Sequence, residues 1–139
     1  MIKLVPPERG QDSQGSGEFG APRGNRKHNG RDYGCLPKSK ILSISSGEVT
    51  KIGYPYNPND TEKGHLRYVQ VTDSVGIQVR YFYVNPLVKL GDKIGLEGVI
   101  GESQDLRPIY QSITPHFHLE VKHEGAFIDP NIYIKGLQR

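Results

Sequence analysis

One stretch decides the fold of this chain: Thr114-Pro115-His116-Phe117-His118-Leu119-Glu120-Val121. After the proline, apolar and polar residues alternate, and a period of two predicts a β-strand. Successive side chains of a strand point to opposite faces, so His116 and His118 share one face of the predicted sheet. Two adjacent imidazoles can bind a metal ion or move protons beside one. Two polar residues on a solvated face explain an isolated His-x-His equally well.

A second cluster, far upstream, favours the metal: His28-Asn29-Gly30-Arg31-Asp32. Its spacing would suit a helix face, but Gly20, Pro22, Gly24, Asn29, Gly30 and Gly34 disfavour a stable helix. We therefore expect His28 on a loop and Asp32 on or near a strand. His28, Asp32 and one later histidine offer two nitrogens and one oxygen, and catalytic zinc commonly takes three such protein ligands. An imidazole-rich set also favours zinc over magnesium or calcium.

Composition narrows the class of protein. The length of 139 residues predicts one domain with a sizeable core, and 35% hydrophobic with 24% charged residues is typical of a soluble globule. The net charge of +3 is mildly basic, but without a nucleic-acid motif or a dense basic patch we expect no nucleic-acid partner. No apolar run reaches the ~18 residues of a membrane span, so no membrane partner is expected. The N-terminus lacks the apolar core of a signal peptide. The single cysteine, Cys35, excludes an intramolecular disulfide.

The sequence predicts an irregular N-terminal lead over residues 1–18, docked on the domain or partly mobile, and a single domain over residues 19–139. The sequence of this domain predicts short strands and turns. Residues 41–44 and 49–52 flank a hairpin or tight bend at Ser46-Gly47, and further strands are expected at 66–72 and 77–84. The loop at 54–64 carries aromatic side chains that can line a groove. No amphipathic helix of useful length is expected. The predicted fold is mainly antiparallel β, with a groove on one sheet face.

The order of several short motifs resembles that of the lysostaphin/LytM-type zinc peptidases, a family that cuts peptidoglycan peptides. The paired signatures are the early H-x-x-x-D and the late H-x-H. Phe19-Gly20-Ala21-Pro22-Arg23 resembles the family's opening FG-x-x-R, and Ser43-Ile44-Ser45-Ser46-Gly47-Glu48-Val49 its A-x-x-x-G-x-V strand, with serine at the alanine position. Residues 88–94 with Ile100-Gly101 resemble V-x-x-G-D-x-V … I-G, and Asp129-Pro130 the closing DP. The resemblance covers residues 19–130. It extends to short phage-encoded members and to the leukocyte chemotaxin branch.

This resemblance implies that His28, Asp32 and His118 hold a zinc ion and that His116 handles protons beside it. Glu120, on the same strand face as His118, can orient that histidine as a hydrogen-bond acceptor or be a surface carboxylate. The histidines His65 and His123 are expected to be solvated or turned to the opposite face.

One segment departs from the family pattern. The family usually has Y-x-H-L, which supplies another active-site histidine, whereas this chain has Tyr81-Phe82-Tyr83-Val84, with Tyr83 at the histidine position. A phenol donates a hydrogen bond to a developing oxyanion, but its pKa of ~10 makes it a poor base at neutral pH. We therefore expect Tyr83 to serve catalysis as a donor. The same segment resembles the leukocyte chemotaxin branch, whose role is signalling.

Two functions follow as hypotheses. The first is a zinc endopeptidase that hydrolyses peptide bonds of bacterial peptidoglycan. Its expected setting is phage lysis or the virion, with virion proteins as further partners and a location in the virion or the host cytoplasm before release to the cell wall. The second is a catalytically inactive, zinc-containing domain that binds a peptide, glycan or protein or has a structural role.

Overall fold

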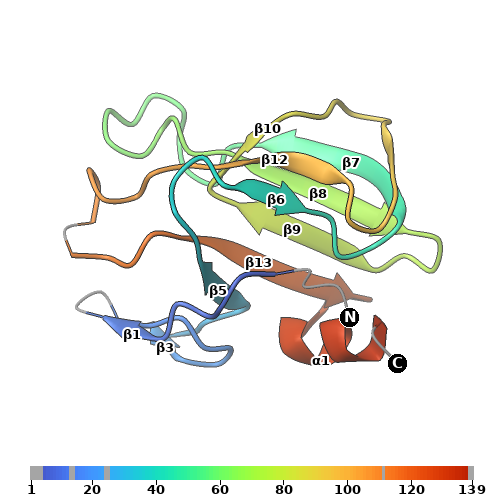
Figure 1. Ribbon diagram of the computed structural model, residues 1–139, viewed down its shortest axis with the longest axis horizontal. Helices are drawn as coiled ribbons and strands as arrows, with labels where there is room; N and C mark the ends of the chain where they lie inside the picture. The colour runs from blue at the N-terminus through green and yellow to red at the C-terminus, as the bar shows by residue number, and fades with distance from the viewer. Residues whose placement is uncertain (1–4, 13–14, 24–25, 111, 138–139) are drawn as a thin grey trace.

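The computed structural model describes residues 5–12, 15–23, 26–110 and 112–137, and its main element is a seven-stranded antiparallel sheet (Figure 1). The strands of this sheet are β5 (Arg31–Gly34), β7 (Gly47–Gly53), β8 (Tyr68–Asp73), β9 (Gln78–Phe82), β11 (Lys93–Ile94), β13 (His116–His123) and β14 (Ala126–Ile128). Their order is β11-β7-β8-β9-β13-β14, and β5 also pairs with β13. The mainly antiparallel β fold that the sequence predicts is confirmed.

The strand predicted after Pro115 is β13, and it has three neighbours. As its alternation predicts, Phe117 and Leu119 are buried in the hydrophobic core, and the two histidines lie on the other face. His118 is opposite Asp32 on β5 along one edge and opposite Phe82 on β9 along the other. Strand pairing therefore places the upstream metal-ligand motif beside the later histidine pair.

A smaller sheet covers the core side of the main sheet (Figure 1). Its strands, in order, are β10 (Val84–Pro86), β12 (Val99–Ser103) and β6 (Lys40–Leu42). Side chains of both sheets form one core, which includes Ile41, Val69, Val71, Val79, Tyr81, Val84, Ile100, Phe117, Leu119 and Val121. Of the hairpin and the tight bend that the sequence leaves open near Ser46-Gly47, the structure has the bend, because β6 and β7 belong to different sheets.

Tyr81 on β9 is fully buried in this core, and its hydroxyl oxygen accepts a hydrogen bond from the Ile44 amide at 3.0 Å. We expect Tyr81→Phe to keep the fold but to lower the free energy of unfolding by about 1–3 kcal/mol, because the buried amide loses its acceptor. Chemical denaturation of both proteins measures this difference. Equal stabilities would show that the Ile44 amide finds another acceptor.

The N-terminal lead is docked on the main sheet wherever the structure describes it. β1 (Gln11–Asp12) and β2 (Gly15–Ser16) form a short hairpin, and the Arg9 amide donates to the Asp32 carbonyl at 2.8 Å. The segment is thus more regular than expected, because strands of two residues carry no periodicity to detect. Residues 1–4 and 13–14 of the predicted lead lie outside the described part of the chain.

A second hairpin precedes the metal-ligand motif. It consists of β3 (Pro22–Arg23) and β4 (Arg26–Lys27), and it follows Gly20, whose φ of 81° is in the left-handed region that glycine adopts without strain. His28 lies on the loop between β4 and β5, and Asp32 lies in β5. Both positions agree with the expectations from the sequence.

A short helix, α1 (Pro130–Leu137), closes the fold, although the sequence predicts no helix of useful length. The Asp129 carboxylate accepts a hydrogen bond from the Asn131 amide at 3.0 Å, and Pro130 takes the first helical position, where no amide donor is needed. Eight residues are too few for a clear helical period, so the Asp-Pro pair was the available signal. Within the described ranges, no helix is long and apolar enough to cross a membrane.

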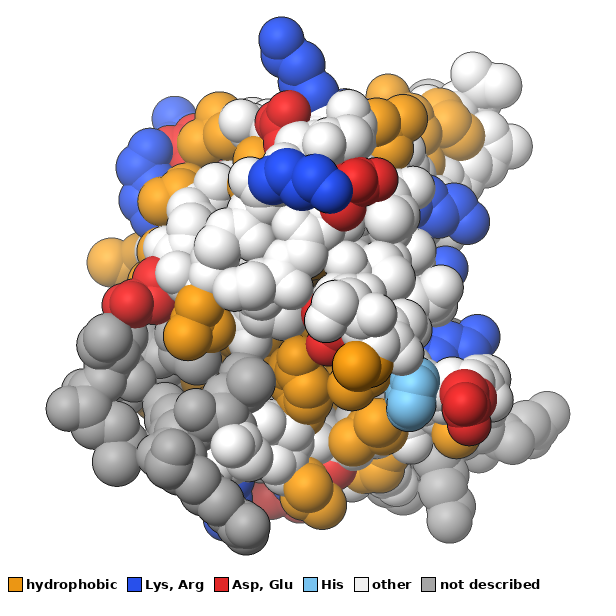
Figure 2. Space-filling view, turned by 90° about the vertical axis from the view of Figure 1, so that its right-hand side faces the viewer, with side chains coloured by type: hydrophobic (Ala, Val, Ile, Leu, Met, Phe, Trp, Pro, Cys, Tyr) orange, Lys and Arg blue, Asp and Glu red, His pale blue; other side chains and the backbone are white. Residues whose placement is uncertain are grey.

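The end of the molecule that lies on the right in Figure 1 has a mixed surface. Figure 2 shows basic, acidic and hydrophobic side chains interspersed there, and among the described side chains in that view neither charge is concentrated in one patch. The start of β13 and the end of β9 lie toward the other end of the molecule in Figure 1. The site described next is therefore away from this mixed surface.

Candidate metal centre

Three donor atoms from the two sequence motifs converge beside the start of β13. His28 Nε2 lies 2.9 Å from His118 Nδ1, and His118 Nδ1 lies 2.8 Å from Asp32 Oδ1. The third side of this triangle, from His28 Nε2 to Asp32 Oδ1, is 3.4 Å. All three side chains are largely buried, with 9%, 4% and 10% exposure for His28, Asp32 and His118. The pairing of β5 with β13 thus assembles one compact group, in which His118 is 86 positions from Asp32 and 90 positions from His28 in the chain.

Hydrogen bonds outside this triangle decide which nitrogen each imidazole turns inward. His28 Nδ1 lies 2.9 Å from the Glu18 carbonyl oxygen, which can only accept, so Nδ1 carries the proton. His118 Nε2 lies 2.9 Å from a carboxylate oxygen of Glu120, which likewise accepts. Each ring therefore directs its other nitrogen toward Asp32. Glu120 has the orienting position that the sequence suggested.

The donor set fits a zinc ion. Ligand atoms that bind one tetrahedral zinc at ~2.0–2.1 Å lie about 3.3 Å apart, which the separation of 3.4 Å between His28 and Asp32 matches, whereas the two separations to His118, 2.9 and 2.8 Å, are shorter. Two imidazole nitrogens and one carboxylate oxygen are the ligand types of catalytic zinc sites, in which the fourth position stays open. Magnesium and calcium prefer sets made of oxygen atoms. The structure therefore brings together the three residues that the sequence predicts as ligands, in a geometry that accommodates the predicted metal.

The protonation states of Asp32 and His118 are also consistent with a role as metal ligands. Burial alone would raise the pKa of Asp32, but hydrogen bonds with His118 and His28 hold it well below its usual range. Burial alone would lower the pKa of His118, but hydrogen bonds with Asp32 and Glu120 raise it to about 9. A ligand imidazole must lose its proton before it binds a metal. A metal ion at this position therefore replaces the proton that the two carboxylates attract to His118.

His116 lies beside the triangle as a buried, neutral imidazole. Its Nδ1 donates to the Thr114 carbonyl at 2.7 Å, which leaves Nε2 as the basic nitrogen. Nε2 lies 3.5 Å from Asp32 Oδ2, the carboxylate oxygen that does not face the other ligands. Burial lowers the pKa of His116 below its ordinary value, so the ring is neutral and able to accept a proton at neutral pH.

Tyr83 follows β9 and turns its ring toward the histidine pair. The ring centres of Tyr83 and His116 are 6.0 Å apart in an edge-to-face arrangement, and those of Tyr83 and His118 are 6.4 Å apart. Tyr83 has a φ of 66°, an uncommon conformation for a residue with a Cβ, and such strained residues cluster at functional sites. Burial and the neighbouring Tyr56 raise the pKa of Tyr83 well above its ordinary value. The phenol therefore keeps its proton at neutral pH, so it can donate a hydrogen bond but is not ionised to act as a base.

Arg9 is a site residue that the sequence gave no reason to select. Its Nη1 lies 2.8 Å from Asp32 Oδ2, and its side chain is only 3% exposed. It lies in the segment for which an irregular structure was expected, and an ion pair across 23 positions leaves no local pattern. Only the docking of the N-terminal segment against β5 brings Arg9 to the site.

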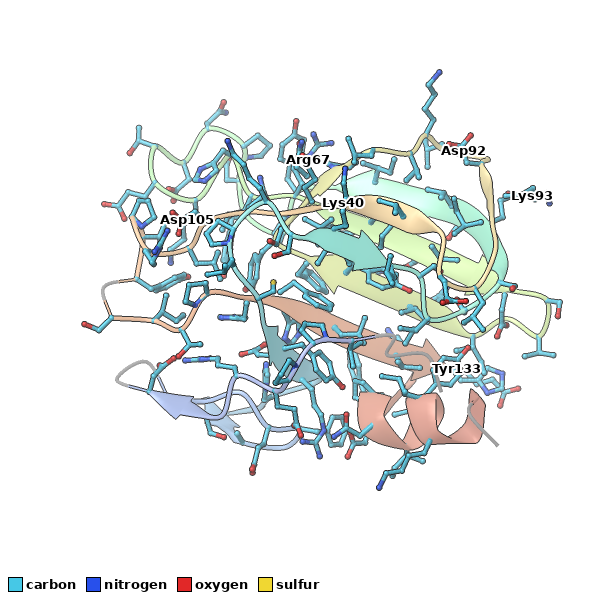
Figure 3. All side chains as sticks on the ribbon, viewed as in Figure 1. Lys40, Arg67, Asp92, Lys93, Asp105 and Tyr133 are labelled. Atoms are coloured by element: carbon cyan, nitrogen blue, oxygen red, sulfur yellow. The ribbon has the colours of Figure 1, made fainter. Side chains whose placement is uncertain are left out.

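The two remaining histidines lie outside the triangle. His123 ends β13, opposite Ala126, and the exposed His65 lines a polar cavity of about 420 Å³ together with Tyr54 and Arg67. Figure 3 labels Arg67 near the 54–64 loop, and its guanidinium carbon lies 4.3 Å from the centre of the Tyr54 ring. The two aromatic residues of the loop therefore lie in different places, because Tyr54 lines this cavity whereas Tyr56 packs beside Tyr83.

Comparison with known proteins places this geometry in context. The model of peptidase family M23 matches residues 26–130. Myeloid protein 1 from Gallus gallus is 30% identical over 116 residues, which are 81% of this chain and 34% of that protein, so the chain spans about a third of its length. Leukocyte cell-derived chemotaxin-2 from Bos taurus is 26% identical over 129 residues, which are 88% of this chain and 76% of that protein. The catalytic domain of the antimicrobial peptidase lysostaphin from Staphylococcus simulans superposes with a TM-score of 0.67 at 22% identity, over 87% of this chain and 90% of that one. The last comparison shows a shared fold.

Proposed function

The chain belongs to peptidase family M23, and from this premise we propose that it is a zinc-dependent endopeptidase that hydrolyses peptide bonds of bacterial peptidoglycan. The observation that carries the proposal is the convergence of His28 Nε2, Asp32 Oδ1 and His118 Nδ1 beside a buried, neutral His116. Such a site combines a metal-ligand set with a proton acceptor. Those two components are what metal-assisted hydrolysis of an amide needs.

His28, Asp32 and His118 would hold the zinc ion. When bound, zinc lowers the pKa of water and polarises a carbonyl group. Glu120 and the Glu18 carbonyl keep the two ligand imidazoles in the correct tautomer, because each accepts a hydrogen bond from the outer ring nitrogen. The ligand atoms therefore need no rearrangement of the rings to face the ion.

His116 is the proposed proton carrier. Its basic Nε2 takes a proton from the attacking water and delivers it to the amide nitrogen that leaves. The Thr114 carbonyl holds the ring through the Nδ1 proton, so the reacting nitrogen keeps its direction during both transfers. Once protonated, Nε2 faces the Asp32 carboxylate at 3.5 Å, which stabilises the imidazolium.

Tyr83 is proposed to donate a hydrogen bond to the oxygen on which negative charge develops. We expect Tyr83→Phe to keep the fold and the zinc content, because the ring packing is preserved, and to lower turnover roughly 10²-fold, the effect of losing one oxyanion donor. Tyr83→His, which introduces the residue usual in the family, should keep or raise turnover. Rates of peptide release by the three proteins, at matched zinc content, test the role. Equal rates for wild type and Tyr83→Phe would mean that Tyr83 only fills space.

The second candidate function is a zinc-containing domain that binds without cleaving, and Tyr83 is the observation that favours it. This position usually carries a histidine in the family, and a phenol with a raised pKa cannot replace a base. A chain of this kind would retain the metal and bind a partner. An inert wild type combined with an active Tyr83→His would identify the domain as a peptidase disabled at one residue.

Digestion of purified peptidoglycan separates the two functions. The protein with zinc should release soluble peptides with new amino termini, which mass spectrometry identifies along with the bond that is cut. The metal-free protein and the His116→Ala variant are the controls, since one lacks the Lewis acid and the other lacks the proton carrier. Co-sedimentation with the polymer in the absence of any release would favour the binding function instead.

A further inference from the structure

We infer that Arg9 is a positioning residue of the metal centre, which it orders by holding one oxygen of the Asp32 carboxylate. This inference rests on the zinc site of the proposed function and extends it to a segment outside the family match at residues 26–130. Arg9 Nη1 binds Asp32 Oδ2 at 2.8 Å, whereas Asp32 Oδ1 faces His118 at 2.8 Å. The guanidinium therefore fixes the carboxylate so that a single oxygen is directed at the other ligands.

Arg9 is itself held in place by Asp12. The two side chains form a bidentate pair, with Nε to Oδ2 at 2.9 Å and Nη2 to Oδ1 at 2.7 Å. Planar, charge-assisted pairs of this kind have a defined orientation, which a single flexible contact lacks. The Asp12 side chain is 11% exposed and that of Arg9 3%, so water screens the pair weakly. Arg9 consequently reaches Asp32 from a fixed direction.

The same network reaches the proton carrier. Asp12 Oδ2 accepts a hydrogen bond from the Thr114 amide at 2.8 Å, and the Thr114 carbonyl binds His116 Nδ1 at 2.7 Å. One continuous path of contacts thus joins the metal-ligand carboxylate, through Arg9 and Asp12, to the residue that orients His116. The N-terminal segment supplies the middle of this path, although neither motif of the sequence includes it.

Backbone contacts keep this segment at a fixed distance from Asp32. The Arg9 amide donates to the Asp32 carbonyl at 2.8 Å, and the Asp32 amide donates to the Gly17 carbonyl at 2.9 Å. A Cβ on Gly17 would lie only 2.8 Å from the Asp32 Cβ, so only glycine allows so close an approach. Asp32 is therefore enclosed between residues 9 and 17 on one side and β13 on the other.

Substitution of Arg9 should weaken zinc binding without removing a ligand. In Arg9→Gln the carboxylate can rotate, so zinc affinity should fall about 10- to 100-fold, as is usual for a group that orients a ligand. Competition with a chromophoric chelator measures this affinity. Cobalt(II) in place of zinc gives a second readout, because its visible absorption weakens when rotation of Asp32 lets both oxygens bind the ion.

Arg31→Gln is the matched control. Arg31 forms a bidentate pair with Asp129, at 2.6 and 2.9 Å, and also contacts Glu8, so it too ties the N-terminal segment to the domain. Neither Asp129 nor Glu8 is one of the three convergent donors. We expect Arg31→Gln to keep a zinc affinity within about threefold of wild type, whereas Arg9→Gln shows the larger loss. This difference would support the positioning role.

Other outcomes overturn the inference. Equal losses in both variants would mean that docking of the segment matters and the Asp32 contact does not, and an unchanged or higher affinity in Arg9→Gln would remove the role altogether. If Arg9→Gln does not fold, Asp12→Asn takes its place, because it retains Arg9 and loosens its orientation, and unchanged zinc binding there also contradicts the inference. These readouts are independent of cleavage: a wild type that binds zinc but cuts nothing leaves the role of Arg9 intact, whereas a wild type that binds no zinc removes both proposals.

Discussion

Replacing His118 by alanine should abolish stoichiometric zinc binding and peptidoglycan cleavage together. The variant retains only His28 and Asp32, and two ligands cannot complete the coordination of the ion. A bound metal that acts as a Lewis acid stabilises the transition state by several kcal/mol, and each ~1.4 kcal/mol changes the rate tenfold. Turnover should therefore fall about 10³-fold or more. Metal analysis after dialysis and the rate of peptide release measure the two effects.

The control for this experiment is His123→Ala on the same strand. His123 lies at the far end of β13, opposite Ala126, and is not a member of the three-residue group. Its substitution should leave zinc content and turnover unchanged. Asp32→Ala should lose zinc as His118→Ala does, and it should also destabilise the protein, because Arg9 keeps its buried charge while one of its two carboxylates is removed. Full zinc content in both His118→Ala and Asp32→Ala would refute the ligand assignment.

Replacing His116 by alanine should separate metal binding from turnover. The His116 side chain is not one of the three convergent donors, so the zinc content should stay at about one ion per chain. Turnover should fall about 10²- to 10⁴-fold, the usual contribution of a positioned general base and acid. Metal analysis and peptide release on the same preparation give both numbers.

His65→Ala is the control for His116, since it also removes an imidazole but at an exposed position that lines the separate polar cavity. It should be indistinguishable from wild type. Loss of zinc from His116→Ala would make this residue a ligand, and normal turnover in the variant would assign proton transfer to another group. The low pKa of His116 predicts in addition that wild-type turnover falls as pH drops and the ring becomes protonated.

The part of the fold that the sequence predicts best is the part with the strongest period. Alternation in residues 116–121 predicts both the strand β13 and the face that carries His116 and His118, because a strand has only two faces. Short elements escaped prediction for the corresponding reason. The hairpin β1–β2 has strands of two residues, and α1 has eight residues, lengths over which a period is not visible.

The sequence could predict the residues of the candidate site that belong to its motifs, but not the contacts that depend on tertiary structure. His28, Asp32 and His118 belong to short patterns whose residue types suggest zinc, and the structure brings them within 3.4 Å of one another. The role of Arg9 depends on tertiary docking, and the turn of Tyr83 toward the histidines depends on a backbone angle that no propensity of tyrosine favours. The phage setting and the groove on the sheet face stay predictions from the sequence.

The most direct test of the proposed function is a zinc titration of the metal-free protein on purified peptidoglycan, with new amino termini counted at each step. The rate of release should rise in proportion to added zinc and level off at about one equivalent per chain, because one site of three protein ligands carries the activity. Binding of one equivalent with no release of amino termini at any step would contradict the assignment as a peptidase.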